Sequence, residues 1–540
     1  MENAALAAKL EAFAALLELN GANYYTARAY RRAAELIRDT RAPVEALVRD
    51  GRVRELRGIG PGIEQRLLEL VETGDLAELR ELEETLLPEL VGLGHLLGVG
   101  PKRMRELAAA LEVRSAEEFR RAVDAGRLRA VPGVGPKTEA KLRAGLARTT
   151  KPRPRRGLLL NRALALAAGI ADALGGTVAG DPRRWRDSSE DFAVVVAAKE
   201  SEPVLRAFAD LPEVVSVVER EERRALGVTV DGVPVELLVP TPEEAGTVLV
   251  RATGSAAYVA ALEPLPAAAD EEGVYAALGV PWCPPELRER PHRDAPPADL
   301  LELGAVRGDL HVHTTWSDGK ASVLEMARAA IERGYEYLAI CDHTTNVRVV
   351  PGLDADGLRR QAEEIAEAND RVAPFRILRG TECDIVADGG LDLPDDVLAE
   401  LDWVQLSLHA GQRAERGELT RKVTEAMRHP AVRCLSHPTG RLINHRPPNA
   451  LDLELAFEVA REEGVAIEVN GLPDRLDLRD EHVRAAIEAG VQICVNTDAH
   501  SVRGLGNMRL AVATARRGWA TVGDVLNTKP LDDVLALRRR

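Results

Sequence analysis

The chain has 540 residues, of which 45% are hydrophobic and 29% charged, and its formal net charge is −15. This is the composition of a soluble globular protein, and the length predicts three or four domains because one core rarely serves more than about 250–300 residues. The longest apolar runs fall short of the ~18 residues of a membrane span, and no basic-then-apolar leader is visible, which predicts a cytoplasmic protein with no membrane partner. The five cysteines lack metal-type spacing and are expected to be buried and reduced.

Charge is distributed unevenly along the chain. Residues 1–157 contain 28 Lys and Arg against 23 Asp and Glu, a net charge of +5, whereas the remaining residues carry −20. A basic tract at 151–156 joins the two parts. This asymmetry favours an anionic substrate that one region holds and another processes, although a solvated basic linker explains the tract alone equally well.

Residues 1–150 are predicted to be helical, from the periodicity of Ala, Leu, Glu and Arg. The expected helices cover 4–19, 26–38, 62–72, 102–111, 116–125 and 137–147. Three short segments repeat two glycines around an aliphatic residue and then open a helix. They carry Gly58 and Gly60; Gly98 and Gly100 with Lys102; and Gly133 and Gly135 with Lys137.

These glycines permit a tight turn, and the helix N-terminus that follows presents free N–H groups to an anion. Three copies favour helix-hairpin-helix motifs that hold a nucleic-acid backbone without reading its sequence. The alternative for a single copy is a plain helix-turn-helix.

The middle of the chain is predicted to mix helix and strand. We expect a helix at 160–174 and strands near 191–197, 213–219, 226–231 and 233–239, before a linker at 284–299. From residue 306 strands and helices alternate, which predicts a parallel sheet that is closed or nearly closed. The expected helices there lie near 322–333, 355–370, 420–428, 451–463 and 480–489.

Histidines and acids follow successive strand-like runs of this last region. If the strands are parallel and closed, side chains at their C-terminal ends converge on one face. Converging imidazoles and carboxylates without thiolates are typical ligands of a divalent metal cluster, so the chain is predicted to be a metal-dependent enzyme. The alternative is a set of core histidines with ordinary hydrogen bonds.

Residues 1–290 resemble the bacterial type of family X DNA polymerases, and the last 235 residues resemble the PHP (polymerase and histidinol phosphatase) domain that follows in those proteins. Two features carry the resemblance: the three hairpins, and the histidines and acids at the ends of the expected strands. Further matching motifs are residues 23–34, 253–255, 278–288, 437–441, 468–470 and 497–501. The resemblance implies a multidomain fold. Its parts are a helical DNA-binding domain (1–88), a fingers-like helical domain with two hairpin motifs (89–150), an α+β nucleotidyltransferase-like palm and thumb (157–290), and a PHP domain (303–540) built as a distorted (β/α)7 barrel.

The resemblance also implies three divalent ions per PHP domain, with Mn²⁺, Zn²⁺ and Fe²⁺ all acceptable. The implied ligands are His311, His313, Glu382 and Asp498 for the first ion; Glu382, His409 and His437 for the second; and Asp318, His343 and His500 for the third. Glu382, Asp498 and His343 are candidate catalytic residues. Arg441 and Arg475 are candidate phosphate-binding cations, with surface salt bridges as the alternative. Asp309 and Asp342 are expected to orient imidazoles, or in the case of Asp342 to cap a loop.

The polymerase-like part departs from the family pattern at the residues that the family uses for catalysis. The family's Asp-x-Asp pair reads Asp191-Phe192-Ala193 here, and the third acid is matched by Glu236. Two-metal nucleotidyl transfer needs bridging carboxylates, so Ala193 predicts a lost or weak polymerase, with Mg²⁺ in the palm only if activity remains. Arg66 stands where lyase-active members carry the Schiff-base lysine, and arginine cannot serve as that nucleophile.

The preferred hypothesis is a metal-dependent DNA phosphoesterase, a 3′→5′ exonuclease or 3′-end processing enzyme that also cleaves abasic sites, in DNA repair. Its expected partners are gapped, nicked or 3′-end DNA and other base-excision repair proteins, and it is expected to be a nucleoid-associated monomer. The alternatives are an active gap-filling polymerase with PHP proofreading, a small-molecule PHP phosphatase, and a non-catalytic DNA-binding scaffold.

Overall fold

The computed structural model describes residues 1–540 except 20–23, 40–43, 57, 86–98, 100, 115, 150–156, 230, 232, 293–294, 348–349 and 538–540. Contacts divide the chain into two compact units. One contains residues 1–155 with 210–216 and 228–232, and the other contains 156–209, 217–227 and 233–540.

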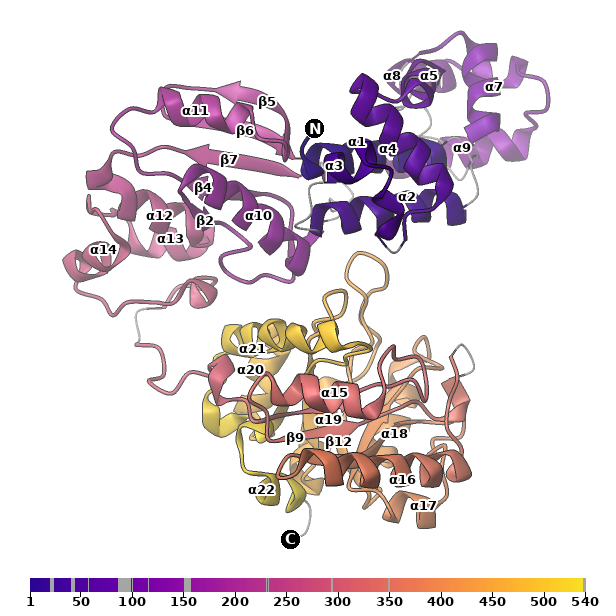
Figure 1. The fold of residues 1–540 in the computed structure, drawn as a ribbon, viewed down its shortest axis with the longest axis vertical. Coiled ribbons are helices and arrows are strands. Elements are labelled where there is room, and N and C mark those ends of the chain that lie inside the picture. Colours follow the sequence, from indigo (N-terminus) through magenta and orange to yellow (C-terminus); the bar gives the residue numbers. More distant parts are fainter. Residues whose placement is uncertain are drawn as a thin grey trace. The chain divides into compact units, whose positions relative to one another are not determined.

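The first 155 residues form a helical array around two hydrophobic clusters (Figure 1). Its helices are α1 (Asn3–Leu19), α2 (Tyr24–Asp39), α3 (Val44–Arg49), α4 (Pro61–Thr73), α5 (Ala77–Thr85), α7 (Pro101–Leu111), α8 (Ala116–Asp124) and α9 (Pro136–Thr149). Six of these match the predicted helices. The helices α3 and α5 are additional; the six residues of α3 are too few for an apolar period to stand out.

Two of the three predicted hairpins lie in described residues. Gly58 has φ +115° and Gly133 has φ +77°, backbone conformations that an L side chain rarely adopts. The helices α4 and α9 then begin at Pro61 and Pro136, where a missing N–H costs nothing. The second hairpin, with Gly98 and Gly100, lies outside the described residues, although α7 begins directly after it.

The middle region (residues 157–290) contains a five-stranded sheet covered by helices. The strand order is β2-β4-β7-β6-β5, and a separate antiparallel pair joins β1 to β3. The strands are β1 (Leu158–Leu159), β2 (Thr177–Ala179), β3 (Ser188–Ser189), β4 (Phe192–Val195), β5 (Val214–Arg220), β6 (Arg224–Thr229) and β7 (Pro234–Leu238). The helices are α10 (Leu160–Leu174), α11 (Glu202–Ala209), α12 (Ala245–Thr253), α13 (Ala256–Leu262) and α14 (Glu271–Leu278). The predicted helix and four predicted strands are present, while β1, β2 and β3 are too short to be read from sequence.

The C-terminal barrel (residues 303–540) is built from seven parallel strands in the order β14-β13-β12-β11-β10-β9-β8. They are β8 (Gly308–Val312), β9 (Tyr337–Ile340), β10 (Arg376–Asp384), β11 (Trp403–Ser407), β12 (Val432–Leu435), β13 (Ala466–Asn470) and β14 (Ile493–Asn496). The first and last strands approach each other, because Val312 bridges Ala499 and the His313 amide donates to the Ala499 carbonyl at 2.9 Å. The sheet is therefore a nearly closed barrel, as predicted.

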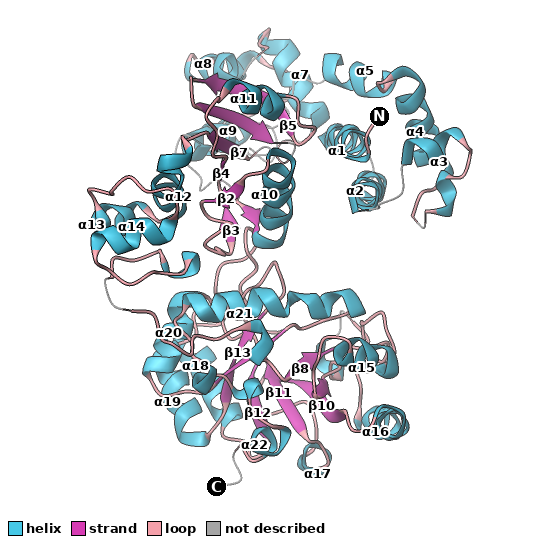
Figure 2. Cartoon of the chain, turned by 60° about the vertical axis from the view of Figure 1, so that its left-hand side comes forward, coloured by secondary structure: helices cyan, strands magenta, loops and turns pink. Residues whose placement is uncertain are grey.

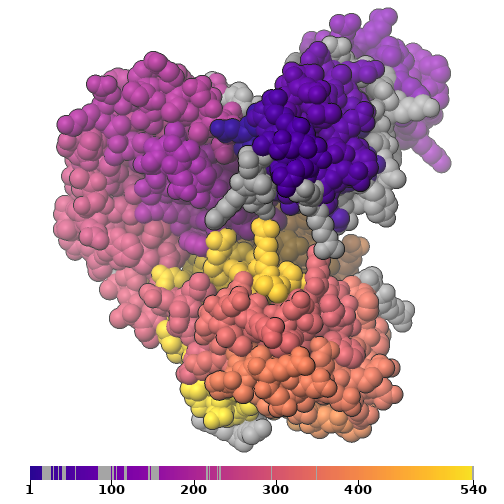
Figure 3. All heavy atoms as spheres, viewed as in Figure 1, coloured from indigo at the N-terminus to yellow at the C-terminus, as the bar shows by residue number. Residues whose placement is uncertain are grey.

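Helices surround these strands (Figure 2). They are α15 (Val323–Ile331), α16 (Ala355–Val372), α17 (Asp395–Ala399), α18 (Arg416–Met427), α19 (Leu453–Glu463), α20 (Asp480–Glu488), α21 (Met508–Arg517) and α22 (Leu531–Leu535). Residues leading into the barrel from the middle region lie against α21 (Figure 3), where Arg516 donates to Glu286 at 2.5 Å.

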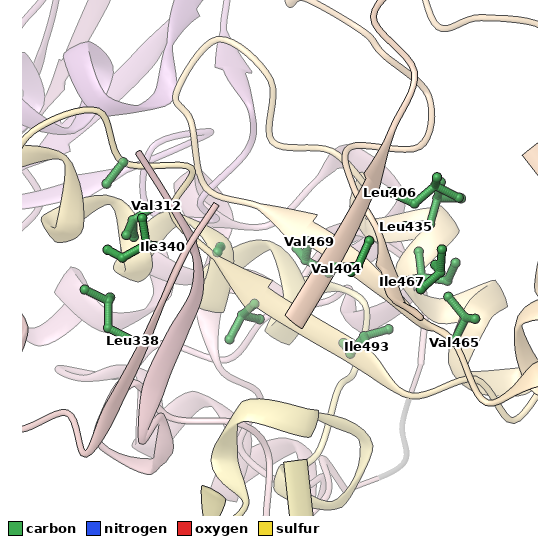
Figure 4. Packing of buried hydrophobic residues seen from close by; sticks show 14 of the residues in the cluster. Val312, Leu338, Ile340, Val404, Leu406, Leu435, Val465, Ile467, Val469 and Ile493 are labelled. Atoms are coloured by element: carbon green, nitrogen blue, oxygen red, sulfur yellow. The ribbon is translucent and has the colours of Figure 1, made fainter. Parts of the chain in front are cut away.

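The barrel strands are buried on both faces, and their apolar core continues from the barrel wall to the helices. Ile340, Val404, Leu406, Ile467 and Ile493 are each 1% exposed or less (Figure 4). Such continuous burial is expected of parallel strands that helices cover. It gives the strand ends a rigid support.

All five cysteines are buried and free, as expected. No helix among the described residues has the length and apolar character needed to cross a membrane.

Candidate metal centre

The polar groups of the strand ends meet at one end of the barrel. His311 lies within β8 and His313 just after it, Glu382 lies within β10, and His343, His409, His437 and Asp498 follow β9, β11, β12 and β14. Each of these side chains is 18% exposed or less. Parallel strands place their carboxyl ends at the same edge, which is why residues nearly 200 positions apart gather here.

Glu382 is the centre of the cluster. One of its oxygens lies 2.9 Å from His343 Nδ1, 3.5 Å from His311 Nε2 and 3.6 Å from His313 Nε2. The other lies 2.9 Å from His437 Nε2 and 3.4 Å from His409 Nε2. A carboxylate that is 1% exposed thus has five imidazoles within 3.6 Å.

A second set lies beside it. His500 Nε2 is 3.2 Å from Asp318 Oδ2, and His343 Nε2 is 3.6 Å from Asp318 Oδ1. His313 Nε2 lies 3.0 Å from Asp498 Oδ1, which connects the two sets. All nine side chains predicted as metal ligands therefore come together.

Three subsets have donor atoms close enough to share one ion, within 4.8 Å of one another: His311, His313 and Glu382; His343, Glu382 and His409; and His313, Asp318, His343 and His500. The donor set fits divalent ions, because it consists of imidazole nitrogens and carboxylate oxygens alone. The Nδ1 atoms of His313 and His409 are also buried without a hydrogen bond to the described residues. Buried polar nitrogens are rarely left unpaired, so a ligand is expected at these positions.

The electrostatics of the site favour ionised acids. Burial opposes ionisation of Glu382, but the charges of His409, His343 and His311 hold the pKa of its carboxyl well below its usual range. Burial and the charges of His500 and His343 lower the pKa of His313 to about 4. The site therefore offers anionic oxygens and a neutral imidazole, the forms that bind cations.

Glu468 is a positioning residue to which the sequence analysis assigned no role. Its Oε1 lies 2.7 Å from His311 Nδ1, and its Oε2 accepts from the His437 amide at 2.8 Å. Gln405 donates to the same carboxylate at 2.9 Å. A carboxylate that is hydrogen-bonded to the second nitrogen of a metal-binding imidazole fixes the tautomer of the ring and raises the basicity of its other nitrogen. The sequence signal that could have identified this role is the position of Glu468, an acid inside the apolar run of β13.

Asp384 holds another ligand in place. Its Oδ1 accepts from the His409 amide at 2.9 Å, and Asn346 donates to its other oxygen at 2.5 Å. Asp384 follows Glu382 by two positions in β10, so the strand's period of two turns both side chains to the same face.

The expectation for Asp309 is wrong. Its carboxylate contacts no imidazole ring; it accepts from the hydroxyl and amide of Thr497 and from the His311 amide. It therefore ties β8 to the turn after β14. Asp342 accepts from Thr314 and from Ser317, so it anchors the loop after β8, whereas the role considered for it was to cap the loop that follows Asp342 itself.

The two candidate phosphate-binding arginines differ. Arg475 points to the metal cluster, with Nε 3.9 Å from Asp498 Oδ2 and its Nη1 buried without a hydrogen bond. Arg441 instead forms an ion pair, which was the alternative considered for it. Its guanidinium donates to Asp187 at 2.8 Å and to the carbonyls of Arg475 and Leu476, so it is not free to bind phosphate.

The polymerase-like positions are adjacent but lack a metal-binding set. Ala193 in β4 pairs in register with Glu236 in β7, as the family pattern implies. Glu236 forms an ion pair with Arg224, and Asp191 is exposed. Groups of three or more potential ligands in the described part of the chain occur only at the barrel.

The described hairpins present their glycines outward. Ile59 and Ile63 are buried while Gly58 is exposed and Gly60 partly so, and Gly133, Gly135 and Lys137 are exposed beside the buried Val131. Arg66, in α4, pairs with Glu69 at 3.1 Å and with Glu78. An amine nucleophile is thus replaced by a paired guanidinium.

Barrel, ligand set and hairpins define a metal-dependent hydrolase fold of the PHP type joined to helix-hairpin-helix domains. Family models agree: residues 1–76 match a helix-hairpin-helix domain, residues 93–148 a SAM-like helix-hairpin-helix tandem, and residues 309–470 a PHP domain. The DNA polymerase/3′-5′ exonuclease PolX of Bacillus subtilis is 34% identical over 566 aligned residues, which cover 98% of each chain. The chain therefore belongs to the PolX family of DNA polymerase/3′-5′ exonucleases.

Further relatives match a smaller part of the chain. A probable phosphatase of Acetivibrio thermocellus is 31% identical over 201 residues, 36% of this chain and 78% of that protein. A probable phosphatase of Aliivibrio fischeri is 28% identical over 236 residues, 41% of this chain and 88% of that protein.

Proposed function

We propose that this protein is a metal-dependent DNA phosphoesterase that removes nucleotides or blocking groups from 3′ ends during DNA repair. The observation that carries the proposal is the buried Glu382 carboxylate with five imidazoles within 3.6 Å. Such a set has no use in a DNA-binding scaffold. Bound divalent ions would activate water and neutralise charge on a phosphoryl oxygen, which suits phosphate-ester hydrolysis.

The proposed ligands keep the predicted partition. His311, His313, Glu382 and Asp498 would hold one ion, Glu382, His409 and His437 a second, and Asp318, His343 and His500 a third. One set of close donors contains three ligands of the first group, and another contains all three of the third. The remaining set joins His343 to Glu382 and His409 of the second group. His437 joins the second because its Nε2 lies 2.9 Å from Glu382. Mn²⁺, Zn²⁺ and Fe²⁺ all fit this mixture of nitrogen and oxygen donors.

Arg475 is the proposed cation for the substrate phosphate. Its guanidinium borders Asp498, and its buried Nη1 has no hydrogen bond in the protein. A planar guanidinium can bind two phosphate oxygens at once, which orients the ester as well as binding it. Glu468 and Asp384 would keep the imidazoles in place while this happens.

Polymerase activity is proposed to be lost or very weak. Ala193 removes one bridging carboxylate, and the ion pair with Arg224 occupies Glu236. The arginines of the segment Gly180–Arg184, which matches the family's Gly-Ser-x-Arg-Arg, are also engaged. Arg183 forms a two-point ion pair with Glu271 at 2.8 Å, and Arg184 bonds Glu289 at 2.8 Å.

The helical domains would hold the DNA. Exposed glycines at the starts of α4 and α9, with Lys137 beside the second, support backbone binding at helix N-termini. We propose the domain boundaries 1–88, 89–150, 157–290 and 303–540. Gapped, nicked or abasic-site DNA and other base-excision repair proteins are the proposed partners.

The test is release of label from 3′-labelled gapped DNA by the full-length protein with Mn²⁺. Wild type is expected to release nucleotide or phosphate, and His311→Ala is expected to abolish this. Wild-type protein that releases nothing, or an unimpaired His311→Ala variant, would refute the proposal. Asp191→Ala is the matched control, because it removes an acid from the polymerase-like sheet only.

A small-molecule phosphatase is the second candidate, favoured by the similarity of part of the chain to the probable phosphatases. The same preparation assayed on a phosphomonoester and on the gapped DNA separates the two. Hydrolysis of the monoester alone would favour the phosphatase.

A further inference from the structure

The loop that carries Arg475 is held by the middle region of the chain. Arg441 lies in the turn that follows β12 and is 7% exposed. It donates to the Arg475 carbonyl at 2.8 Å and to the Leu476 carbonyl at 2.5 Å. Its remaining nitrogen donates to Asp187 at 2.8 Å, and Asp187 immediately precedes β3. One buried guanidinium therefore joins the middle region to the backbone beside Arg475.

Leu476 is the second point of attachment. Its φ of +41° is unusual for a residue other than glycine, so surrounding contacts must hold it. The side chain is 1% exposed and packs with Ile443, Leu510 and Leu160. Leu160 is the first residue of α10, so the middle region supports this strained residue from its apolar side as well.

The supporting segment is itself anchored. Arg517, in α21, donates to the Arg184 carbonyl at 2.6 Å and lies 3.1 Å from Glu289. Its other nitrogen bonds Asp480 at 2.6 Å. Residues 184–187 are thus attached to the barrel at both ends, through Arg517 at one and Arg441 at the other.

The consequence concerns Arg475, which is adjacent to Leu476 in the loop. Its amide and that of Leu476 both donate to the Leu472 carbonyl, at 2.9 and 3.0 Å, so the backbone here is a single tight turn. The side chain leaves this turn toward Asp498, with Nε at 3.9 Å. A shift of the turn would therefore move the guanidinium relative to the metal cluster.

We infer that Asp187, acting through Arg441, is a positioning residue for Arg475. The segment Gly180–Arg184, which matches the family's Gly-Ser-x-Arg-Arg, has its arginines in ion pairs, and the residues that follow it up to Asp187 support the phosphoesterase site. The inference rests on the proposed function for its catalytic consequence, but the mechanical link from Asp187 to the Arg475 turn does not depend on it.

The catalytic test is a double-mutant cycle in the full-length protein, measured on a 3′-labelled oligonucleotide with Mn²⁺. Asp187→Ala is expected to lower kcat/KM about 10-fold, mainly by raising KM, because it leaves a buried charged hydrogen bond unmade. Asp187→Glu is expected to restore part of the loss. In the Arg475→Ala background, Asp187→Ala is expected to lower kcat/KM less than about 2-fold, because the effects of substitutions at coupled residues are not additive.

The second test needs no activity. Hydrogen exchange at the amides of Arg475 and Leu476 is expected to become at least about 10-fold faster in Asp187→Ala, because the turn opens more often. Asp172→Ala is the matched control: it removes an exposed carboxylate from α10 of the same region. Its exchange and kinetics are expected to equal those of wild type.

The outcomes separate the two proposals. Unchanged exchange in Asp187→Ala, or equal kinetic losses in the wild-type and Arg475→Ala backgrounds, would overturn the positioning role. Faster exchange in a protein that shows no hydrolysis would keep the link from Asp187 to the turn and refute the proposed function instead.

Discussion

The barrel and the middle sheet place acids on adjacent strands in the same way, yet their surroundings differ. In the barrel, Glu382 is surrounded by imidazoles. In the middle sheet, Glu236 lies beside Ala193 and pairs with Arg224. Glu271 likewise pairs with Arg183 and Arg288. Glu382 thus has imidazole nitrogens as its neighbours, whereas Glu236 and Glu271 are paired with arginines.

The middle sheet also keeps its fold without a group of metal-binding side chains among its described residues. The middle sheet keeps a parallel β4–β7 pair and a buried core. Its stability comes from packing and ion pairs, neither of which needs bound metal. Experiments that remove single carboxylates from each region can break or sharpen this comparison.

The largest effect is expected from Glu382→Gln. Losing the shared carboxylate should remove several kcal/mol of charge stabilisation and lower the rate of hydrolysis at least about 10³-fold. Metal content by elemental analysis should fall as well. Asp191→Ala should change neither, and a Glu382→Gln variant with normal rate and metal content would contradict the role of the barrel.

Glu271→Gln should instead act on stability. Arg288 is fully buried, so removing its partner should cost about 3–5 kcal/mol in the free energy of unfolding, without loss of metal. Burial opposes ionisation, but hydrogen bonds from Arg183 and Arg288 lower the pKa of Glu271 below its ordinary value of 4.5. Its contribution is therefore present above about pH 4.5 and is lost as the pH falls through the folded-state pKa.

Denaturant unfolding of wild type and Glu271→Gln at a series of pH values checks this prediction. The stability difference should be constant near neutral pH and shrink in acid. A difference that grows as the pH falls would show that the sign is wrong.

Glu468→Gln should have an intermediate effect on catalysis. It keeps the shape of the side chain but weakens the contact with His311 Nδ1, and such partners are typically worth about 10- to 100-fold in metal affinity or activity. Titration with Mn²⁺ and the hydrolysis assay measure the two quantities. Equal Mn²⁺ affinities and equal hydrolysis rates in Glu468→Gln and wild type would mean that His311 does not need the Glu468 carboxylate.

The smallest effect is expected for nucleotide incorporation. Wild type and Asp191→Ala should both give background incorporation of a labelled dNTP on gapped DNA, because Ala193 cannot bridge two ions. His343→Ala serves as the control for nuclease removal of product. Incorporation that disappears only in Asp191→Ala would favour the gap-filling polymerase.

Much of the fold and of the metal cluster was predictable from sequence. Apolar runs that end in His311, His343 or Asp498 are local patterns, and a parallel barrel brings the ends of all its strands to one edge. Helices such as α10 were predictable for the same local reason. Short elements such as β1 and α3 were not, because few residues carry little periodic signal.

The tertiary structure alone decided which side chains meet across the chain. His311 and Glu468 are 157 positions apart, and Arg441 and Asp187 are 254 apart. Sequence periodicity reports which face of a strand a residue occupies, but not which distant residue lies opposite. That choice depends on strand order, register and packing, and it gives Arg441 the ion pair with Asp187, which the sequence left as one of two alternatives.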